Sequence, residues 1–289
     1  MEVYRKTDEI RSRVRRWHEA GLSVGLVPTM GALHEGHLNL IRGSDDRCDR
    51  SVVSVFVNPT QFGEDEDLEA YPRRLEEDVR KAEENGAEAV FAPSERCMYP
   101  AGYSTFVIQE QLTDVLCGRH RPGHFRGVLT IVTKLFNICE PERAFFGRKD
   151  FQQSVVLRRM TRDLNFPVEL CVLPTVRESD GLAVSSRNEY LSPTQREEAV
   201  CLYRALREAQ RCFQGGERSA EAIKERMQEL LDDYPQARVE YLEIVSPDDL
   251  QSVEKVAGDS VAALAVYVGE TRLIDNMPLG ECQDIILDN

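Results

Sequence analysis

The stretch Val24-Gly-Leu-Val-Pro-Thr-Met-Gly-Ala-Leu-His-Glu-Gly-His-Leu-Asn-Leu-Ile41 carries most of the information about the fold. Its apolar start, residues 24–27, is typical of a buried parallel strand. Pro28 lacks a backbone donor and is expected to end that strand. Gly31 allows a sharp turn. Leu38 and Ile41, one helical turn apart, then indicate a helix packed on a sheet.

Two histidines, His34 and His37, lie at this predicted turn from strand to helix. Three positions apart on a helix, they can face the same way. A helix N-terminus presents unpaired N–H groups and partial positive charge, which suit a phosphate, and Gly36 lets a ligand approach the backbone. An ordinary surface turn is the alternative. Zinc binding is a third interpretation, although no Cys or further His stands nearby in sequence.

Composition limits the classes of partner. The chain has 289 residues, enough for one large domain or two smaller ones, and a formal net charge of −14. This charge argues against non-specific binding to nucleic acid or to anionic membranes, but not against a local anion pocket. The eight cysteines form no C-x-x-C pair and predict neither a disulfide framework nor a zinc ribbon. With no apolar signal segment and no run near about 18 apolar residues, we expect a soluble, cytoplasmic protein.

Strand and helix signals alternate along the first two thirds of the chain. Buried strands are predicted at residues 24–27, 51–57, 87–92, 143–147 and 168–173. This alternation predicts an α/β fold with a Rossmann-like parallel sheet, which we place at residues 1–180. From Ser192 the pattern changes to two helices (192–213 and 219–233) and three short strands, the last two joined by a hairpin at Gly269-Glu270. Residues 181–289 therefore predict a smaller α+β C-terminal domain.

Polar residues follow the second predicted strand, at the end where parallel sheets bind ligands. Asn58 and Gln61 lie there, and Gln61 offers both a donor and an acceptor for a hydroxyl or carboxylate. An Asn-Pro turn is the alternative. The acidic run at residues 64–67 is expected to be a solvated face. The basic segment at residues 118–127 predicts an anion pocket in an otherwise acidic chain, or else a surface loop.

A second turn from strand to helix follows residues 143–147. It carries Lys149, which suits a phosphate as a point charge, and Asp150, which suits ribose hydroxyls or caps the helix. After the fifth strand, a polar loop contains Ser185, Ser186 and Arg187. Arginine supplies charge and a bidentate fork and serine supplies hydrogen bonds, so this loop can wrap triphosphate oxygens.

The His-x-Gly-His turn and the Ser-Ser-Arg loop together resemble the HIGH and KMSKS signatures of the nucleotidyltransferase superfamily. Within it, the chain resembles the pantothenate synthetase (pantoate–β-alanine ligase) family nearly end to end. The matching segments are residues 28–37, 56–62, 71–73, 118–128, 146–153 and 177–188.

The resemblance implies a two-step ligation that uses ATP and Mg²⁺. Pantoate's carboxylate attacks the α-phosphate of ATP, which gives pantoyl adenylate and pyrophosphate. The amine of β-alanine then attacks the activated acyl carbon, and AMP leaves with pantothenate formed. A homodimer is also implied, with no membrane or nucleic acid as partner.

The resemblance also implies a role for each matching residue. His34, His37, Lys149 and Arg187 are expected to be catalytic, and Asp150 to bind ribose. Gln61, Gln153 and Asn58 are the expected substrate-binding residues. Apart from the resemblance, Asp78 on the charged helix after residue 71 is a candidate metal ligand, although such a carboxylate is usually solvated. The expected ATP-binding residues are Met30, Gly31, Ala32, Leu33, His34, Glu35, Gly36, His37, Gly147, Arg148, Lys149, Asp150, Val176, Val184, Ser185, Ser186 and Arg187.

The sequence departs from the family pattern at two of these positions. Arg148 stands where the family usually has an acidic residue or Gln, and Val184 where it has Met or Leu. A cytidylyltransferase or a phosphopantetheine adenylyltransferase is the nearest rival, and would retain the nucleotide on its product. An aminoacyl-tRNA synthetase would need a basic tRNA face. A nucleotide-binding regulator without catalysis is disfavoured by the intact histidines.

Overall fold

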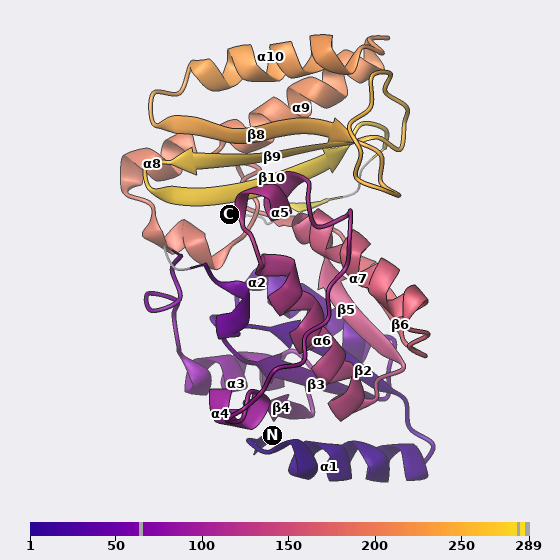
Figure 1. Ribbon diagram of the computed structural model, residues 1–289. Coiled ribbons are helices and arrows are strands. Elements are labelled where there is room, and N and C mark those ends of the chain that lie inside the picture. Colours follow the sequence, from indigo (N-terminus) through magenta and orange to yellow (C-terminus); the bar gives the residue numbers. More distant parts are fainter. Residues whose placement is uncertain (64–65, 282–283, 287–289) are drawn as a thin grey trace. The chain divides into compact units, whose positions relative to one another are not determined.

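The computed structural model describes residues 1–63, 66–281 and 284–286 (Figure 1). The chain divides into two compact units, each made of separate segments. The first unit comprises Met1–Glu110, Arg121–Arg148 and Val156–Leu173. The second comprises Gln111–His120, Lys149–Val155 and the chain from Pro174 onward. The sequence prediction used a single cut after residue 180 instead.

The first unit is built on a parallel sheet, as the alternating pattern predicted. Among the described residues the sheet has six strands in the order β1-β4-β3-β2-β5-β6. From β2, the strands β3 and β4 extend one way and β5 and β6 the other, so the order reverses between β2 and β5. Parallel sheets bind ligands beyond the carboxyl ends of the strands at such a point. The strands are β1 (Glu2–Tyr4), β2 (Val24–Thr29), β3 (Arg50–Val55), β4 (Ala89–Phe91), β5 (Arg143–Gly147) and β6 (Glu169–Leu173).

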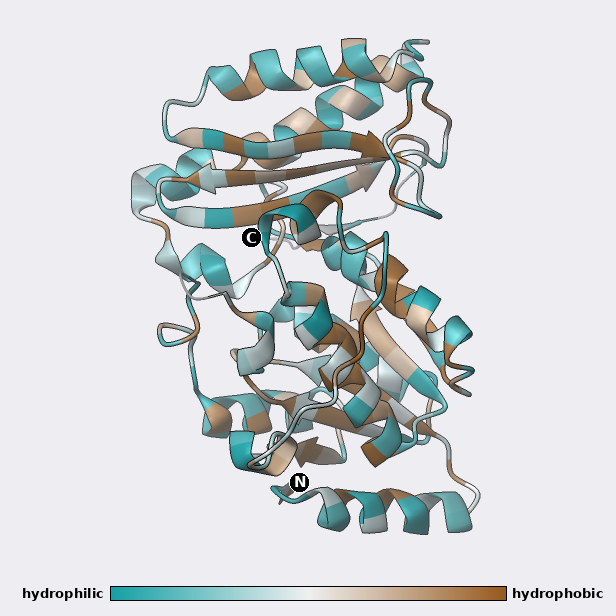
Figure 2. Cartoon of the chain, viewed as in Figure 1, coloured by the Kyte–Doolittle hydropathy of each residue, from teal (hydrophilic) through white to brown (hydrophobic). Residues whose placement is uncertain are grey.

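Helices connect these strands. They are α1 (Thr7–Glu19), α2 (Glu35–Asp45), α3 (Leu75–Glu84), α4 (Glu95–Met98), α6 (His124–Cys139) and α7 (Phe151–Asp163), with 3-10 turns η1 (Pro59–Gln61) and η2 (Arg148–Asp150). Helix α6 is the most apolar of them: Val128, Leu129, Val132 and Leu135 are buried, and Figure 2 shows it largely brown. Ile41 of α2 packs with Val27, Val53 and Phe145 of the sheet in one core cluster, which confirms that this helix covers the sheet.

The expectation that Pro28 ends the first strand is wrong. Pro28 lies opposite Ser54 in the register of β2 and β3, and β2 continues to Thr29. On its other side, β2 pairs with β5 only at Gly25 and Leu26. Beyond Leu26 the strand has one neighbour, so the missing N–H of Pro28 interrupts no ladder on the β5 side.

The second unit contains a smaller antiparallel sheet, ordered β10-β9-β8, as the α+β pattern predicted. Its strands are β8 (Ala237–Val245), β9 (Val261–Val268) and β10 (Thr271–Pro278), and the predicted hairpin joins the last two. Helices α9 (Cys201–Gln214) and α10 (Ala220–Asp232) share a core with this sheet (Figure 1). The single helix expected at residues 192–213 is instead divided into α8 (Pro193–Glu198) and α9.

Three short elements complete the second unit: α5 (Leu116–His120) and the parallel pair β7 (Val176–Arg177) and β11 (Ile285–Ile286). None of the helices in the described ranges is long and apolar enough to cross a bilayer. The seven cysteines within these ranges are free thiols, and Cys282 lies outside them.

Candidate functional site

The turn after β2 has an unusual backbone conformation. Gly31 has a φ of +87° and Ala32 a φ of +51°, and the left-handed region is costly for alanine. A Cβ atom at position 31 would lie 2.9 Å from Oδ2 of Asp78 and 3.0 Å from Cγ1 of Val55. Position 31 therefore requires glycine both for its conformation and for its space.

Asp78 of α3 fixes this turn in place. Its Oδ2 accepts the N–H of Ala32 at 3.0 Å and its Oδ1 accepts the N–H of Leu33 at 2.7 Å. One helical turn further on, the ammonium of Lys81 donates to the carbonyl oxygen of Leu33 at 2.8 Å. Asp78 is only 2% exposed, and this burial raises the pKa of its carboxyl despite the opposing backbone donors. These hydrogen bonds from Asp78 and Lys81 stabilise the turn and so offset the backbone strain at Ala32.

These contacts give Asp78 a structural role. Each of its carboxylate oxygens already accepts one backbone hydrogen bond. In the part of the chain that the structure describes, no group of three or more His, Cys, Asp or Glu side chains is arranged to hold a metal ion. A metal-binding role for Asp78 stays a prediction.

Asp78→Asn is expected to lower the free energy of unfolding by about 1–3 kcal/mol. An amide has one acceptor oxygen, so one of the two buried N–H groups would lose its partner and face the amide NH₂. Urea unfolding at pH 7 measures the change. Glu76→Gln, an exposed position on the same helix, is the control and should stay within about 0.5 kcal/mol of the parent. Equal stability of the two variants would show that Asp78 does not hold the turn.

The two histidines lie at the N-terminus of α2, as the sequence predicted. His34 is the N-cap residue, and its backbone N–H donates to Nδ1 of His37 at 3.4 Å. The rings stack with their centroids 4.0 Å apart and an angle of 25° between their planes. Because Nδ1 of His37 accepts this bond, the proton of the neutral ring belongs on Nε2. Nε2–H is then a donor for an anion at the helix N-terminus.

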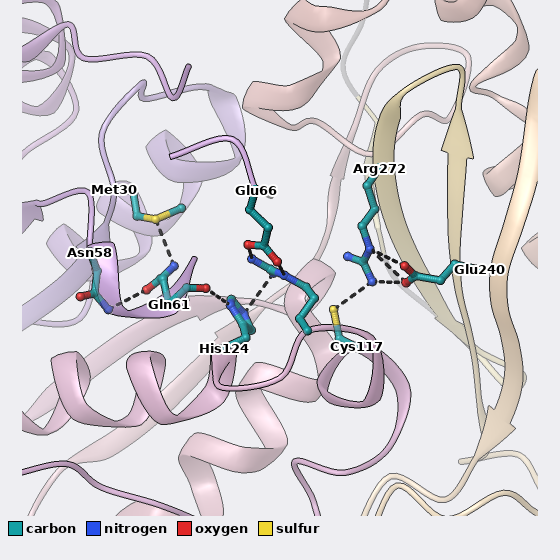
Figure 3. Close-up of polar contacts among 9 residues, drawn as sticks. Met30, Asn58, Gln61, Glu66, Cys117, His124, Glu240 and Arg272 are labelled. Carbon is teal, nitrogen blue, oxygen red and sulfur yellow. Dashed lines mark hydrogen bonds and ion pairs between the residues drawn. The ribbon is translucent and has the colours of Figure 1, made fainter. Parts of the chain in front are cut away.

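Gln61 is held through its side chain and its backbone (Figure 3). Its Oε1 accepts from Nδ2 of Asn58 at 3.0 Å, and its Nε2 lies 3.1 Å from Sδ of Met30. Its carbonyl oxygen lies 2.8 Å from Nδ1 of His124. Asn58 is 1% exposed and also donates to the carbonyl oxygen of Gly127 at 3.1 Å. This geometry supports a role for Asn58 in orienting Gln61, and contact of either residue with a substrate stays a prediction.

The basic segment is partly neutralised by the acidic run. Arg121 donates to the two carboxylate oxygens of Glu66 at 2.7 and 2.5 Å, and its Nη1 lies 3.2 Å from Nε2 of His124. The expectation of a solvated face is therefore wrong for Glu66, whereas Glu64 and Asp65 lie outside the described residues. The ion pair links the segment at residues 66–67 to His124, and so to the backbone of Gln61.

Glu66→Gln is expected to show a pH-dependent loss of stability. Burial raises the pKa of the Glu66 carboxyl, but the hydrogen bonds and charge of Arg121 outweigh it and hold the pKa below its ordinary 4.5. A depressed folded-state pKa gives stability that is present above the unfolded-state value and is lost as the pH falls through the folded-state value. The loss should be about 1–2 kcal/mol at pH 7.

Urea unfolding of parent and variant between pH 3 and 7 tests this, and the difference should shrink in the acid range. Glu169→Gln removes a carboxylate from an exposed pair with Arg143 and should change stability by less than about 1 kcal/mol. A Glu66→Gln difference that stays constant with pH would contradict the ion-pair interpretation.

In the second unit, Lys149 and Asp150 belong to the 3-10 turn η2 and form an ion pair at 3.8 Å. The two glutamines that follow, Gln152 and Gln153, differ in how deeply their side chains are buried. Gln152 is buried, and its Nε2 donates to the carbonyl oxygens of Leu112 and Val115, both at 2.8 Å. Gln153, the expected substrate-binding residue, is half-buried.

The Ser-Ser-Arg loop begins with a tight hairpin. The N–H of Val184 donates to the carbonyl oxygen of Val176 at 3.0 Å. Gly181, with φ +96°, occupies the turn, where a Cβ would lie 2.0 Å from the ring of Tyr203. Ser185 then caps the 3-10 turn η3 (Ser186–Tyr190) by accepting the N–H of Arg187 at 3.3 Å. One predicted serine thus has a capping role, and the other, Ser186, is 8% exposed.

The expected ATP-binding residues fall in both units: residues 30–37, Gly147 and Arg148 in the first, and Lys149, Asp150, Val176 and residues 184–187 in the second. Sequence reasoning missed Lys81, Asp275 and Asn276, which support these segments, and Glu66, which supports Gln61 through Arg121 and His124. The sequence did not mark these four residues, because each acts on a partner far along the chain.

Comparison with known proteins identifies the family. Residues 2–278 match the model of the family described as pantoate-beta-alanine ligase. A pantothenate synthetase of Moorella thermoacetica is 53% identical over 96% of this chain and 99% of its own length. One of Pelotomaculum thermopropionicum is 52% identical over 97% of this chain and 100% of its own.

Solved structures agree. The chain is similar to the crystal structure of pantothenate synthetase from Thermus thermophilus, with a TM-score of 0.93 and 44% identity over 97% of this chain and 100% of that one. It is also similar to the pantoate-beta-alanine ligase of Francisella tularensis, with a TM-score of 0.80 and 31% identity over 96% of this chain and 98% of that one. The chain is therefore an enzyme of the pantoate–β-alanine ligase family.

Proposed function

We propose that this ligase joins pantoate to β-alanine through a pantoyl adenylate, and that ATP is converted to AMP and pyrophosphate. The observation that carries the proposal is the stacked pair His34 and His37 at the N-terminus of α2, beside the reversal point of a parallel sheet. A helix N-terminus at such a point is suited to phosphate oxygens, which supports the proposal. The Francisella tularensis relative, solved in complex with β-γ ATP and β-alanine, supports the same pair of ligands here.

In the first step, Nε2–H of His37 donates to a phosphate oxygen of ATP, with His34 beside it. Lys149 and Arg187 add positive charge, and Asp150 accepts from the ribose hydroxyls. Gln61 and Gln153 hold pantoate so that its carboxylate faces the α-phosphate. Fixed donors aimed at the charge that develops there lower the barrier, because they need no reorganisation during the reaction.

In the second step, the amine of β-alanine attacks the acyl carbon of the adenylate, and the C–O bond to AMP breaks. Adenylation is needed because a free carboxylate does not condense with an amine in water. The residues expected on the nucleotide are found in both units. A closed site would also protect the acyl adenylate from hydrolysis.

The resemblance also implies Mg²⁺, a homodimer and a cytoplasmic location, which stay predictions. We assign no step to the metal, since both carboxylate oxygens of Asp78, its expected ligand, already accept backbone N–H groups. The dimer can be tested by light scattering of the purified chain.

Release of AMP and pyrophosphate, measured with pantoate and β-alanine each omitted in turn, tests the proposal. With pantoate alone, we expect exchange of labelled pyrophosphate into ATP but little AMP in solution. Addition of β-alanine should release AMP with pantothenate. Release of ADP and phosphate would overturn the adenylate step, and a nucleotide retained on the product would instead indicate a nucleotidyl transfer.

A further inference from the structure

Strand β10 buries two consecutive polar residues, Asp275 and Asn276, which are 3% and 4% exposed. Neighbouring side chains of a strand point to opposite faces, so both faces of β10 are covered at this point. A buried polar group is costly unless it is hydrogen-bonded. The contacts of these two residues show what their burial achieves.

Asp275 holds the hairpin that precedes the Ser-Ser-Arg loop. Its carboxylate accepts from Nη1 and Nη2 of Arg177 at 2.6 and 3.1 Å. Arg177 is fully buried, and its Nη1 also donates to the carbonyl oxygen of Gly181 at 3.2 Å, across the turn. Asp275 of β10 therefore holds the turn at Gly181 in place through Arg177. This turn precedes Val184 and Arg187 in the chain.

Asn276 holds the turn that contains Lys149. Its Nδ2 donates to the carbonyl oxygen of Lys149 at 2.8 Å. Its backbone is tied to the first contact: its N–H donates to Oδ1 of Asp275 at 2.8 Å, and its carbonyl oxygen accepts from Nη2 of Arg177 at 3.4 Å. All of these residues belong to the second unit. One dipeptide is therefore bonded directly to the turn that contains Lys149 and, through Arg177, to the hairpin that precedes Ser185.

We propose that Asp275 and Asn276 are positioning residues that set the spacing between Lys149 and the Ser185–Arg187 loop for one nucleotide triphosphate. The inference rests on the proposed function, in which Lys149 and Arg187 contact the phosphates. Asp275 and Asn276 act through the backbone of Lys149 and through Arg177, and they do not contact the substrate. A displacement of about 1 Å in a catalytic group can cost about 10²-fold in rate, so this spacing matters for catalysis.

The test begins with Asn276→Leu, which removes the amide donor at similar side-chain volume. We expect kcat/KM for ATP to fall about 10–100-fold. The KM for pantoate should change by less than about 3-fold, which is near the variation found between mutations at sites that do not interact. The same substitution is then made in a Lys149→Met background. If Asn276 acts through Lys149, its further effect there should shrink to less than about 3-fold.

Gln210→Met is the matched control. Gln210 is also a buried amide of the second unit, and its Nε2 donates to the carbonyl oxygens of Pro278 and Gly280. We expect this variant to lose stability with little change in kcat/KM for ATP. Should Asn276→Leu fail to fold, Asn276→Asp replaces the donor by a carboxylate of the same size and is measured in its place.

The outcomes distinguish a failure of this inference from a failure of the proposed function. If Lys149→Met lowers activity but the effects of the two substitutions multiply, Asn276 is merely structural and the inference fails while the proposed function stands. An unchanged kcat/KM in Asn276→Leu has the same meaning. If Lys149→Met keeps full activity, the assignment of Lys149 to phosphate fails, and the inference fails with it.

Discussion

His37→Ala is expected to lower the rate of pantoyl adenylate formation by about 10²–10³, the usual loss when one preorganised donor is removed from a charged transition state. In the proposed first step, negative charge grows on the oxygens around the α-phosphate as the carboxylate attacks. In the folded chain, the His34 amide fixes Nδ1 of His37, which keeps the proton on Nε2, where it can reach that charge. Alanine removes this donor.

Exchange of labelled pyrophosphate into ATP, with pantoate and without β-alanine, measures this step separately from the second. The KM for β-alanine should change little, because the proposed mechanism has the amine react after pyrophosphate has left. His37→Asn, which keeps a side-chain donor, should recover part of the rate. Near-normal exchange in His37→Ala would refute the role assigned to this residue.

His18→Ala is the control for the loss of a histidine as such. His18 lies on α1 of the same unit, and its Nε2 is 3.3 Å from Glu142. Nothing in the sequence or the structure links it to the nucleotide, so pyrophosphate exchange should stay at the parent rate. Equal losses in the two variants would point to a general effect on folding rather than to catalysis at position 37.

The sequence predicted five strands of the parallel sheet because each is a short, mainly apolar run between turn residues, and these signals are local. It missed the edge strand β1, Glu2–Tyr4, which has three residues and no such run. The histidine turn was predictable for the same reason: strand, glycine and helix follow one another within 18 residues. The end of β2 was mispredicted, because the effect of Pro28 depends on which neighbour faces it. The neighbour of each strand depends on the order of strands in the sheet, and this order cannot be read from the sequence of one strand.

The supporting residues could not be predicted, since each acts on a partner far along the chain. Asp78 binds the turn at Ala32 and Leu33, and Arg121 binds Glu66 from 55 residues away. On sequence alone, Asp78 resembled any carboxylate on a charged helix. Its burial depends on how α3 packs, and this depends on the whole sheet.

Arg177→Met is expected to destabilise the second unit by about 3–5 kcal/mol, the usual cost of removing one partner from a buried ion pair. The Arg177 side chain is fully buried, and it donates to Asp275 and to Asp284, both at 2.6 Å. Without the guanidinium, the carboxylate of Asp275, 1% exposed as a side chain, would lose its counter-charge. Methionine keeps much of the volume, so the loss reports charge and hydrogen bonding rather than a cavity.

Hydrogen exchange of the β9 and β10 amides measures this loss locally, without assuming that both units unfold together. Arg196→Met is the control: Arg196 also donates to two carboxylates, those of Glu178 and Asp180, but its side chain is 29% exposed, and such pairs contribute about 0–1 kcal/mol. The double variant Arg177→Met/Asp275→Leu should recover part of the stability, since it removes the buried charge along with its partner. If Arg177→Met cost no more than Arg196→Met, the buried pair would contribute little to the second unit. The spacing proposed for Lys149 and Arg187 would then lose its support from Arg177, which is the residue that joins β10 to the hairpin before Arg187.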